Sequence, residues 1–209
     1  MRFRRYPRPV TERKRIIIPH RGLAASKTRL APVLSPEERM ALGARLLTRV
    51  LEVARQVADD VVVISPSASL AALVEAAGAR LSVQRGLGLN AGLDQARREA
   101  LSDGVDTLLV FHGDLPNLQA SEVDALLAAC PSPLGVAIAP DRAGTGTNGL
   151  CLRPPGIIEF AFGDGSFARH QAEAQTAAAR LEIVRLPGLA FDLDTPADLA
   201  RWLELGDAA

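Results

Sequence analysis

The amino-acid sequence predicts an α/β fold in three layers, in which helices cover both faces of a mostly parallel sheet. Short apolar runs rich in β-branched residues alternate with stretches of helical periodicity along most of the 209 residues. This alternation is typical of parallel sheets. Apolar residues make up 48% of the chain, which is enough for a full hydrophobic core. We therefore expect a single domain over residues 15–205.

The first half of this domain is predicted to contain three strands and three helices. Ile16-Ile17-Ile18 ends at Pro19 and indicates a buried strand. Ser35, Pro36 and Glu38 predict a capped helix start, and apolar residues recur at helical spacing after it. The next elements are expected at Val61–Ile64 (strand), Leu70–Ala77 (helix, ended by Gly78), Leu81–Val83 (weak strand) and Leu89–Leu101 (helix).

The second half begins with the strongest predicted strand, Thr107–Phe111, which runs into His112-Gly113-Asp114-Leu115-Pro116. The elements after it are expected as a helix capped by Ser121-Glu122-Val123-Asp124, a strand at Gly135–Ala139, a helix at Phe167–Ala179, a weaker strand at Leu181–Leu186 and a last helix capped by Thr195-Pro196-Ala197-Asp198. The segment 141–187 breaks the alternation, so we interpret it as an insertion that shapes an acceptor site. Ligands of such sheets bind beyond the carboxyl ends of the strands, where Asp114 would lie.

Composition and charge narrow the class of protein. Residues 1–14 are basic but lack the apolar core of a secretory signal, so we expect a disordered leader. Its arginines could contact nucleic acid, yet the formal net charge of zero argues against a dedicated nucleic-acid binder. No apolar run approaches the 18 residues of a membrane span. Cys130 and Cys151 fit neither a disulfide framework nor a metal motif, which favours a cytoplasmic setting.

Two glycine-rich loops in the second half are typical of phosphate binding. In the first, Gly144-Thr145-Gly146-Thr147-Asn148 follows an apolar strand, and in the second, Phe162-Gly163-Asp164-Gly165-Ser166-Phe167 precedes a helix. Glycine lets the backbone approach a ligand, and hydroxyl and N–H groups then serve as donors to an anion. A tight turn without a ligand is the alternative for each loop. Together they favour a phosphorylated substrate, with Arg169 or His170 as further phosphate contacts.

Two loops in the first half are candidates for a nucleotide. Gly22-Leu23-Ala24-Ala25-Ser26-Lys27-Thr28 resembles a Walker A loop but lacks the glycine before the lysine, which argues against a P-loop enzyme. We still expect this loop to bring Lys27 and Arg29 to a triphosphate, although a solvated basic turn is the alternative. Gly86-Leu87-Gly88-Leu89-Asn90-Ala91 formally matches a dinucleotide fingerprint. We interpret it instead as a turn that lines a base pocket.

Three carboxylates are the candidates for metal chemistry. Asp114 ends the strongest strand, and Asp192 and Asp194 flank Leu193. Residues two apart in an extended segment point to the same side, so both could reach one site. Oxygen ligands of this kind suit Mg²⁺, which is held by one or two carboxylates together with substrate phosphates. A turn residue (Asp114) and an ordinary acid beside a helix (Asp194) are the alternatives. No histidine is assigned a catalytic role.

Taken in order, these motifs resemble the CofC/FbiD family of guanylyltransferases of coenzyme F-420 (deazaflavin) biosynthesis. The resemblance extends from about Ile16 to Leu199, almost the whole chain. It is carried by Ser26-Lys27-Thr28-Arg29-Leu30, Leu34-Ser35-Pro36-Glu37-Glu38-Arg39, Gly88-Leu89-Asn90, Gly113-Asp114-Leu115-Pro116, Ala139-Pro140-Asp141-Arg142, Gly144-Thr145-Gly146-Thr147-Asn148, Phe162-Gly163-Asp164-Gly165-Ser166-Phe167 with Arg169-His170, and Asp192-Leu193-Asp194-Thr195-Pro196.

The resemblance implies a Rossmann-like, nucleotide-diphospho-sugar transferase-like fold, similar to the molybdenum-cofactor guanylyltransferases. It also implies transfer of GMP from GTP to the phosphate of phosphoenolpyruvate or 2-phospho-L-lactate, with 3-phosphoglycerate used by some relatives. The implied and expected site residues are Asp114, Asp192 and Asp194 for Mg²⁺; Lys27, Arg29 and Asp114 for catalysis; Gly22, Lys27, Gly88 and Asn90 for the nucleotide; and Thr147 (or Asn148), Gly163, Ser166 and Arg169 for the acceptor.

Several alternatives stay open from the sequence. His20-Arg21 and His112 depart from the family's usual residues and could alter nucleotide or acceptor preference. Another nucleotidyltransferase, acting on a sugar phosphate or on molybdopterin, and a nucleotide-binding regulatory module without catalysis are the competing functions. The expected partners are small molecules, without nucleic acid or membrane, and the chain is either a monomer or a homodimer. The sequence does not distinguish between the candidate phospho-acids.

Overall fold

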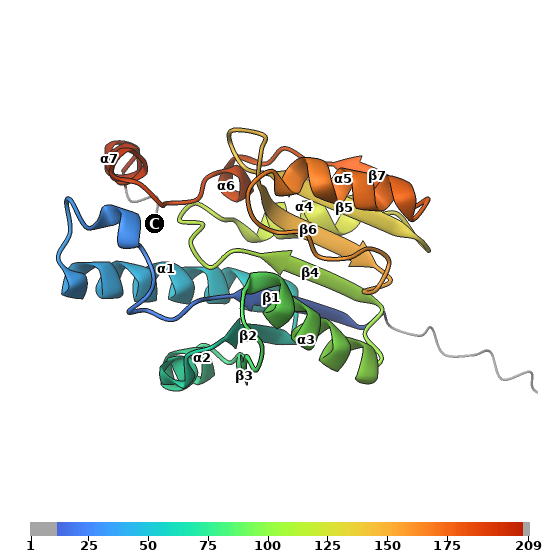
Figure 1. The fold of residues 1–209 in the computed structure, drawn as a ribbon, viewed down its shortest axis with the longest axis horizontal. Helices are drawn as coiled ribbons and strands as arrows, with labels where there is room; N and C mark the ends of the chain where they lie inside the picture. Colours follow the sequence, from blue (N-terminus) through green and yellow to red (C-terminus); the bar gives the residue numbers. More distant parts are fainter. Residues whose placement is uncertain (1–11, 207–209) are drawn as a thin grey trace, which may run out of the picture.

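Seven strands form one sheet in the order β3-β2-β1-β4-β6-β5-β7 in the computed structural model, which describes residues 12–206 (Figure 1). Neighbouring strands pair in parallel except at β6, which runs antiparallel to both β4 and β5. The strands are β1 (Lys14–Pro19), β2 (Val61–Ser65), β3 (Arg80–Val83), β4 (Thr107–Phe111), β5 (Gly135–Pro140), β6 (Thr147–Arg153) and β7 (Arg180–Ile183). The predicted mostly parallel sheet is confirmed.

Helices cover both faces of the sheet, as predicted (Figure 1). Alternate residues of β1 show the two faces: Ile16 and Ile18 pack with α1, α2 and α4, whereas Ile17 packs with α3 and α5. All three side chains are fully buried. The longer helices are α1 (Pro36–Val57), α2 (Ala71–Ala76), α3 (Leu89–Ser102), α4 (Ala120–Ala129), α5 (Ser166–Thr176) and α7 (Pro196–Glu204), and shorter ones are η1 (Thr28–Leu30), η2 (Ala68–Leu70) and α6 (Pro187–Ala190). None of these described helices is long and apolar enough to cross a membrane.

A third apolar cluster anchors the segment that leads into α7. Phe191 and Leu193 pack there with Trp202 and with side chains of η1 and α1. Because an extended chain alternates sides, Asp192 and Asp194 then point away from this cluster. The capping box predicted at Thr195 and Asp198 is present and fixes the start of α7. Apolar packing thus holds two of the candidate carboxylates in place.

The structure corrects the predicted start of α4. This helix begins at Ala120, not after Ser121, because the carboxylate of Glu122 accepts a hydrogen bond from the backbone N–H of Gln119 at 3.2 Å. The capping-box acid lies three residues after the cap, so Gln119 occupies the cap position.

The sequence analysis did not predict β6. Thr147, Asn148 and Gly149 are typical of turns, yet they begin a strand whose first six residues are buried. Segment 141–187, interpreted as an insertion, supplies β6, α5 and β7, and β6 lies inside the sheet. Of the expected basic leader, residues 1–11 lie outside the described part, and Lys14 begins β1.

Candidate active site

The largest group of candidate residues lines one cleft at the carboxyl ends of β1, β2 and β4. This cleft has a volume of about 530 Å³. Its lining includes Gly88 and the polar side chains of His20, Lys27, Arg29, Gln84, His112, Asp114, Asn148, Asp192 and Asp194. The position is the one that open α/β sheets use for ligands, because loops from several strands converge there. The segments that line it include residues 19–29, 84–89, 112–114 and 192–194, which are far apart in the sequence.

The ammonium group of Lys27 joins the loop after β1 to the two carboxylate-bearing segments. Its Nζ donates hydrogen bonds to Asp114 Oδ2 at 2.7 Å, to Asp194 Oδ1 at 3.1 Å and to the carbonyl of Leu193 at 2.6 Å. Only 4% of the Lys27 side chain is exposed. All three N–H groups of an ammonium are therefore used by protein oxygens in this state.

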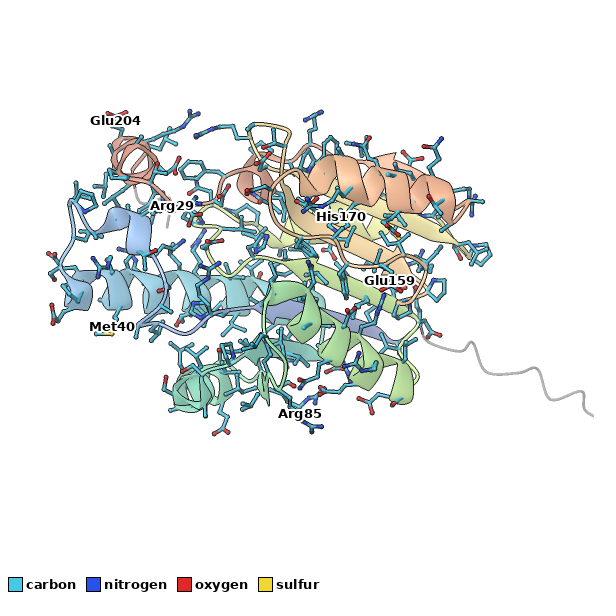
Figure 2. All side chains as sticks on the ribbon, viewed as in Figure 1. Arg29, Met40, Arg85, Glu159, His170 and Glu204 are labelled. Atoms are coloured by element: carbon cyan, nitrogen blue, oxygen red, sulfur yellow. The ribbon has the colours of Figure 1, made fainter. Side chains whose placement is uncertain are left out.

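Arg29 is placed differently from Lys27. Its guanidinium Nη1 lies 3.5 Å from Asp194 Oδ2, and 73% of its side chain is exposed (Figure 2). An exposed ion pair of this kind is weak. The guanidinium is consequently free to bind an anion that enters the cleft.

Asp114 is a charged group with one unsatisfied oxygen. Burial alone would raise its pKa, but the charge and hydrogen bond of Lys27, with the nearby His112 and His20, hold the pKa below its usual value. Asp114 Oδ1 is buried and has no hydrogen-bond partner within residues 12–206. Such an unpaired buried oxygen is costly unless a ligand or cation satisfies it.

Asp192 lies beside the same charges. Burial raises its pKa, and the negative charges of Asp114 and Asp194 add to this effect. A hydrogen bond from Asn148 Nδ2 to Asp192 Oδ1, at 3.1 Å, acts in the opposite direction. A partly desolvated carboxylate near two others favours the binding of a cation.

The predicted trio of metal ligands shares the cleft but is not assembled as a metal-binding cluster. Within residues 12–206, no three His, Cys, Asp or Glu side chains come close enough together to hold a metal ion. The ammonium of Lys27 instead pairs with Asp114 and Asp194. Mg²⁺ needs only one or two protein carboxylates when substrate phosphates supply further oxygens. The unpaired oxygen of Asp114 and the carboxylate of Asp192 fit that requirement.

The expected acceptor residues Thr147, Gly163, Ser166 and Arg169 are not among those that line the cleft. Thr147 and Ser166 are each 2% exposed and bind each other, since the Thr147 N–H donates to Ser166 Oγ at 2.9 Å. The Thr147 hydroxyl lies 2.9 Å from Nδ1 of His170. These side chains hold the first turns of α5 against the start of β6. Of the alternatives at Thr147 and Asn148, Asn148 is the one that lines the cleft.

The expected nucleotide residues also divide into two groups. Lys27 and Gly88 line the cleft, whereas Gly22 and Asn90 do not. Gly22 adopts a φ of +94°, which favours glycine, and its N–H donates to Nδ1 of His20 at 3.0 Å. The side-chain amide of Asn90 binds the backbone of Phe162, so it is committed to a protein contact.

Histidines contribute to the architecture of the site in ways that the sequence did not reveal. His112 lines the cleft, and its Nε2 lies 3.2 Å from the carbonyl of Thr147. Because a carbonyl can only accept, Nε2 carries the proton in this contact. The ring meets Phe162 edge-on at 5.7 Å between centroids. Burial lowers the pKa of His20, which also lines the cleft, to about 4.

His170 is fully buried on α5 (Figure 2) and holds two segments at once. Its Nε2 accepts a hydrogen bond from the N–H of Ala161 at 3.0 Å, so Nδ1 is the atom that can donate to Thr147. Burial, with a smaller contribution from the charge of Arg169, lowers its pKa to about 4. His170 is therefore neutral near pH 7. Its ring is fully buried and both of its nitrogens bind protein atoms, unlike the exposed side chain expected for a phosphate contact.

Comparison with known proteins identifies relatives along almost the whole chain. The family described as "Guanylyl transferase CofC like" matches residues 14–208. The chain is 50% identical over 186 residues to the phosphoenolpyruvate guanylyltransferase of Sphaerobacter thermophilus, which covers 88% of this chain and 89% of that protein. It is 31% identical to the 3-phospho-D-glycerate guanylyltransferase of Colwellia psychrerythraea, over 90% of each of the two chains.

The fold also matches solved structures. A crystal structure from Desulfovibrio desulfuricans G20, named as a nucleotide-diphospho-sugar transferase, superimposes with a TM-score of 0.75. It covers 95% of this chain and 90% of its own, with 18% identity, so the likeness concerns the fold alone. The expected type of α/β fold is confirmed by this match.

Replacement of His170 by a residue that does not titrate should reduce the acid sensitivity of the fold. Because the folded pKa of about 4 lies below the ordinary value of 6.5, the unfolded chain binds the proton more readily between these values. Stability present above pH 6.5 is thus lost as the pH falls toward 4. Between pH 7 and pH 5 this one group accounts for about 2 kcal/mol.

Urea unfolding at the two pH values measures this loss in the native protein and in His170→Gln. Glutamine retains a donor and an acceptor, so the variant should fold. We expect the native protein to lose about 2 kcal/mol more than the variant. Equal losses would show that His170 is not held neutral by the fold.

Proposed function

Because the chain belongs to the family of CofC-like guanylyl transferases, we propose that it transfers GMP from GTP to the phosphate of phosphoenolpyruvate or 2-phospho-L-lactate. The chain is thus a nucleotidyltransferase that acts on small molecules. The observation that carries the proposal is the cleft in which Lys27 and Arg29 lie beside Asp114, Asp192 and Asp194. We further propose that the reaction belongs to coenzyme F-420 biosynthesis and that the protein is cytoplasmic.

The reaction joins two anions and needs little acid–base chemistry. An oxygen of the acceptor phosphate forms a bond to the α-phosphorus of GTP, the bond from that phosphorus to the bridging oxygen breaks, and pyrophosphate leaves with the electron pair. The attacking oxygen is already ionised near pH 7, so no general base is required. The main barrier is electrostatic repulsion and alignment of the two substrates.

Charged side chains of the cleft reduce that repulsion. Mg²⁺ would be held by Asp114 and Asp192 and would supply positive charge at the α-phosphate. Arg29 is exposed and free to bind the departing pyrophosphate. Lys27 fixes Asp114 and Asp194 relative to each other, as its three hydrogen bonds indicate. In this assignment Asp194 serves mainly as the ion-pair partner of Lys27 and Arg29.

The acceptor is proposed to bind at the start of α5. The helix of eleven residues begins after Gly165 without a side-chain cap. Its first two N–H groups donate to the carbonyls of Gly163 and Thr145, which leaves the third, that of Ala168, for an anion. Gly163 and Gly165 have positive φ angles of 116° and 69°, which shape the loop around this end. Ser166 is buried and its hydroxyl oxygen accepts from the Thr147 N–H, so it would fix this end of the helix for the phosphate. Relatives named for phosphoenolpyruvate and for 3-phospho-D-glycerate support a small phospho-acid.

A pyrophosphate-release assay tests the function directly. Each of the four nucleoside triphosphates is paired with phosphoenolpyruvate, 2-phospho-L-lactate and 3-phosphoglycerate in the presence of Mg²⁺. We expect release with GTP and at least one of these acids. Absence of release with GTP and every acid, or efficient transfer only to a sugar phosphate, would contradict the proposal. Chelation of the divalent cation should abolish release, and restoring it should return activity.

Asp114→Asn should remove most turnover while the fold is retained. The two side chains have nearly the same shape, but the amide loses the charge that would hold the cation. We expect kcat to fall about 100-fold or more. Turnover is measured by pyrophosphate release, and circular dichroism checks the fold. Near-normal turnover in a folded variant would refute the role of Asp114 in cation binding.

Lys27→Met should strengthen the binding of Mn²⁺ in the absence of nucleotide, although turnover falls. Removal of the ammonium frees Asp114 Oδ2 and leaves Asp194 only its weak pair with Arg29, so a divalent cation binds about tenfold more tightly. Electron paramagnetic resonance of free Mn²⁺ measures the affinity. Arg29→Met is the matched control, because Arg29 is exposed and only weakly paired. Weaker Mn²⁺ binding by Lys27→Met alone would refute this competition.

A further inference from the structure

Asn90 joins two loops that lie on different sides of the proposed reaction. It is in the first turn of α3, two residues after Gly88, which lines the cleft. Its Nδ2 donates to the carbonyl of Phe162 at 3.1 Å, and its Oδ1 accepts from the N–H of Phe162 at 2.9 Å. One planar amide thus binds both backbone groups of a single residue, which fixes that residue in position and orientation.

The backbone around Phe162 lacks the hydrogen bonds of regular secondary structure. Residues 161–164 belong to no helix or strand, and side chains bind their polar groups instead. His170 accepts from the N–H of Ala161, and Arg169 donates to the carbonyls of Ala161 and Asp164. Both of these side chains belong to α5, which follows the loop directly. Of the described side chains that bind this backbone, Asn90 alone comes from an element outside α5.

Asn90 also fixes an aromatic contact that reaches the cleft. Phe162 is 5% exposed, and its ring lies edge-on against His112 at 5.7 Å between centroids. His112 in turn lines the cleft two residues before Asp114. A displacement of Phe162 would therefore alter both the loop that follows it and one wall of the cleft.

We infer that Asn90 is a positioning residue that fixes the acceptor loop, residues 161–166, relative to the nucleotide loop at Gly88. The inference rests on the proposed function, because it takes Gly163 and Ser166 as the acceptor side. In-line attack depends on the separation and angle of the two substrates, and small displacements reduce its rate greatly. The Asn90 amide acts through Phe162 and does not itself contact a substrate. This replaces the expectation that Asn90 recognises the base.

The test compares Asn90→Leu with a matched variant of the same helix. Leucine is close to asparagine in size but forms neither hydrogen bond. Gln95→Leu also removes an amide from α3, but that amide binds the backbone at Arg85 and Val83 instead of the acceptor loop. Both variants should lose similar stability. Asn90→Asp is the second variant. It keeps the oxygen that accepts from the Phe162 N–H but places a second carboxylate oxygen against the Phe162 carbonyl, which repels it.

Steady-state kinetics and hydrogen exchange provide the measurements. We expect Asn90→Leu and Asn90→Asp to lower kcat/KM for the phospho-acid about tenfold or more, with the Kd for GTP within about twofold of the native protein. Amides of residues 161–166 should exchange faster in both variants. Gln95→Leu should show neither change.

The outcomes separate this inference from the proposed function. A rise in the Kd for GTP with an unchanged kcat/KM for the acid would overturn the inference and return Asn90 to the nucleotide side. Unchanged exchange at residues 161–166 would overturn it even if the enzyme has a different acceptor. Absence of guanylyl transfer by the native protein would overturn the proposed function, while the exchange measurement would still decide whether Asn90 holds the loop.

Discussion

The ammonium of Lys27 is the contact on which the site depends, because it binds oxygens from two segments that are remote in sequence. Its partners Asp114 and Asp194 are 87 and 167 residues away along the chain. Both carboxylates are partly buried, and without a cation between them they would repel each other. The backbone N–H of Leu193 also donates to the carbonyl of Asp114 at 3.1 Å, which adds a neutral bond to the same junction. The cleft therefore exists only when these segments are brought together.

Apolar packing makes this polar junction possible. Phe191 and Leu193 are held in the cluster beneath α7, and their alternation with Asp192 and Asp194 directs the carboxylates toward the cleft. Burial of apolar side chains thus offsets the cost of desolvating charged ones. The cluster also contains Leu30 of η1, the short helix that directly follows Lys27. The same group of contacts positions the cation and its carboxylate partners.

Local signals in the sequence were sufficient to predict most of the fold, but they did not predict which atoms the polar side chains bind. The capping boxes at Ser35 and Thr195 could be predicted because each joins residues that are only three apart, and both are present in the structure. Strand β6 was missed because its first residues resemble a turn, and only its place between β4 and β5 makes it a strand. The amide of Asn90 was assigned to a nucleotide base because its partner, Phe162, is 72 residues away. Residue type indicated a hydrogen-bonding role, and the tertiary fold determined the partner.

The distribution of charge in the site is consistent with a reaction between two anions. Burial keeps His20 and His170 neutral near pH 7, so both serve as hydrogen-bonding groups without adding charge. A neutral imidazole can accept at one nitrogen and donate at the other, as His170 does between Ala161 and Thr147. Attack by an ionised phosphate requires no proton transfer, so the reaction does not need a histidine that gains or loses a proton. Their contribution is to the placement of loops, on which the alignment of an in-line displacement depends.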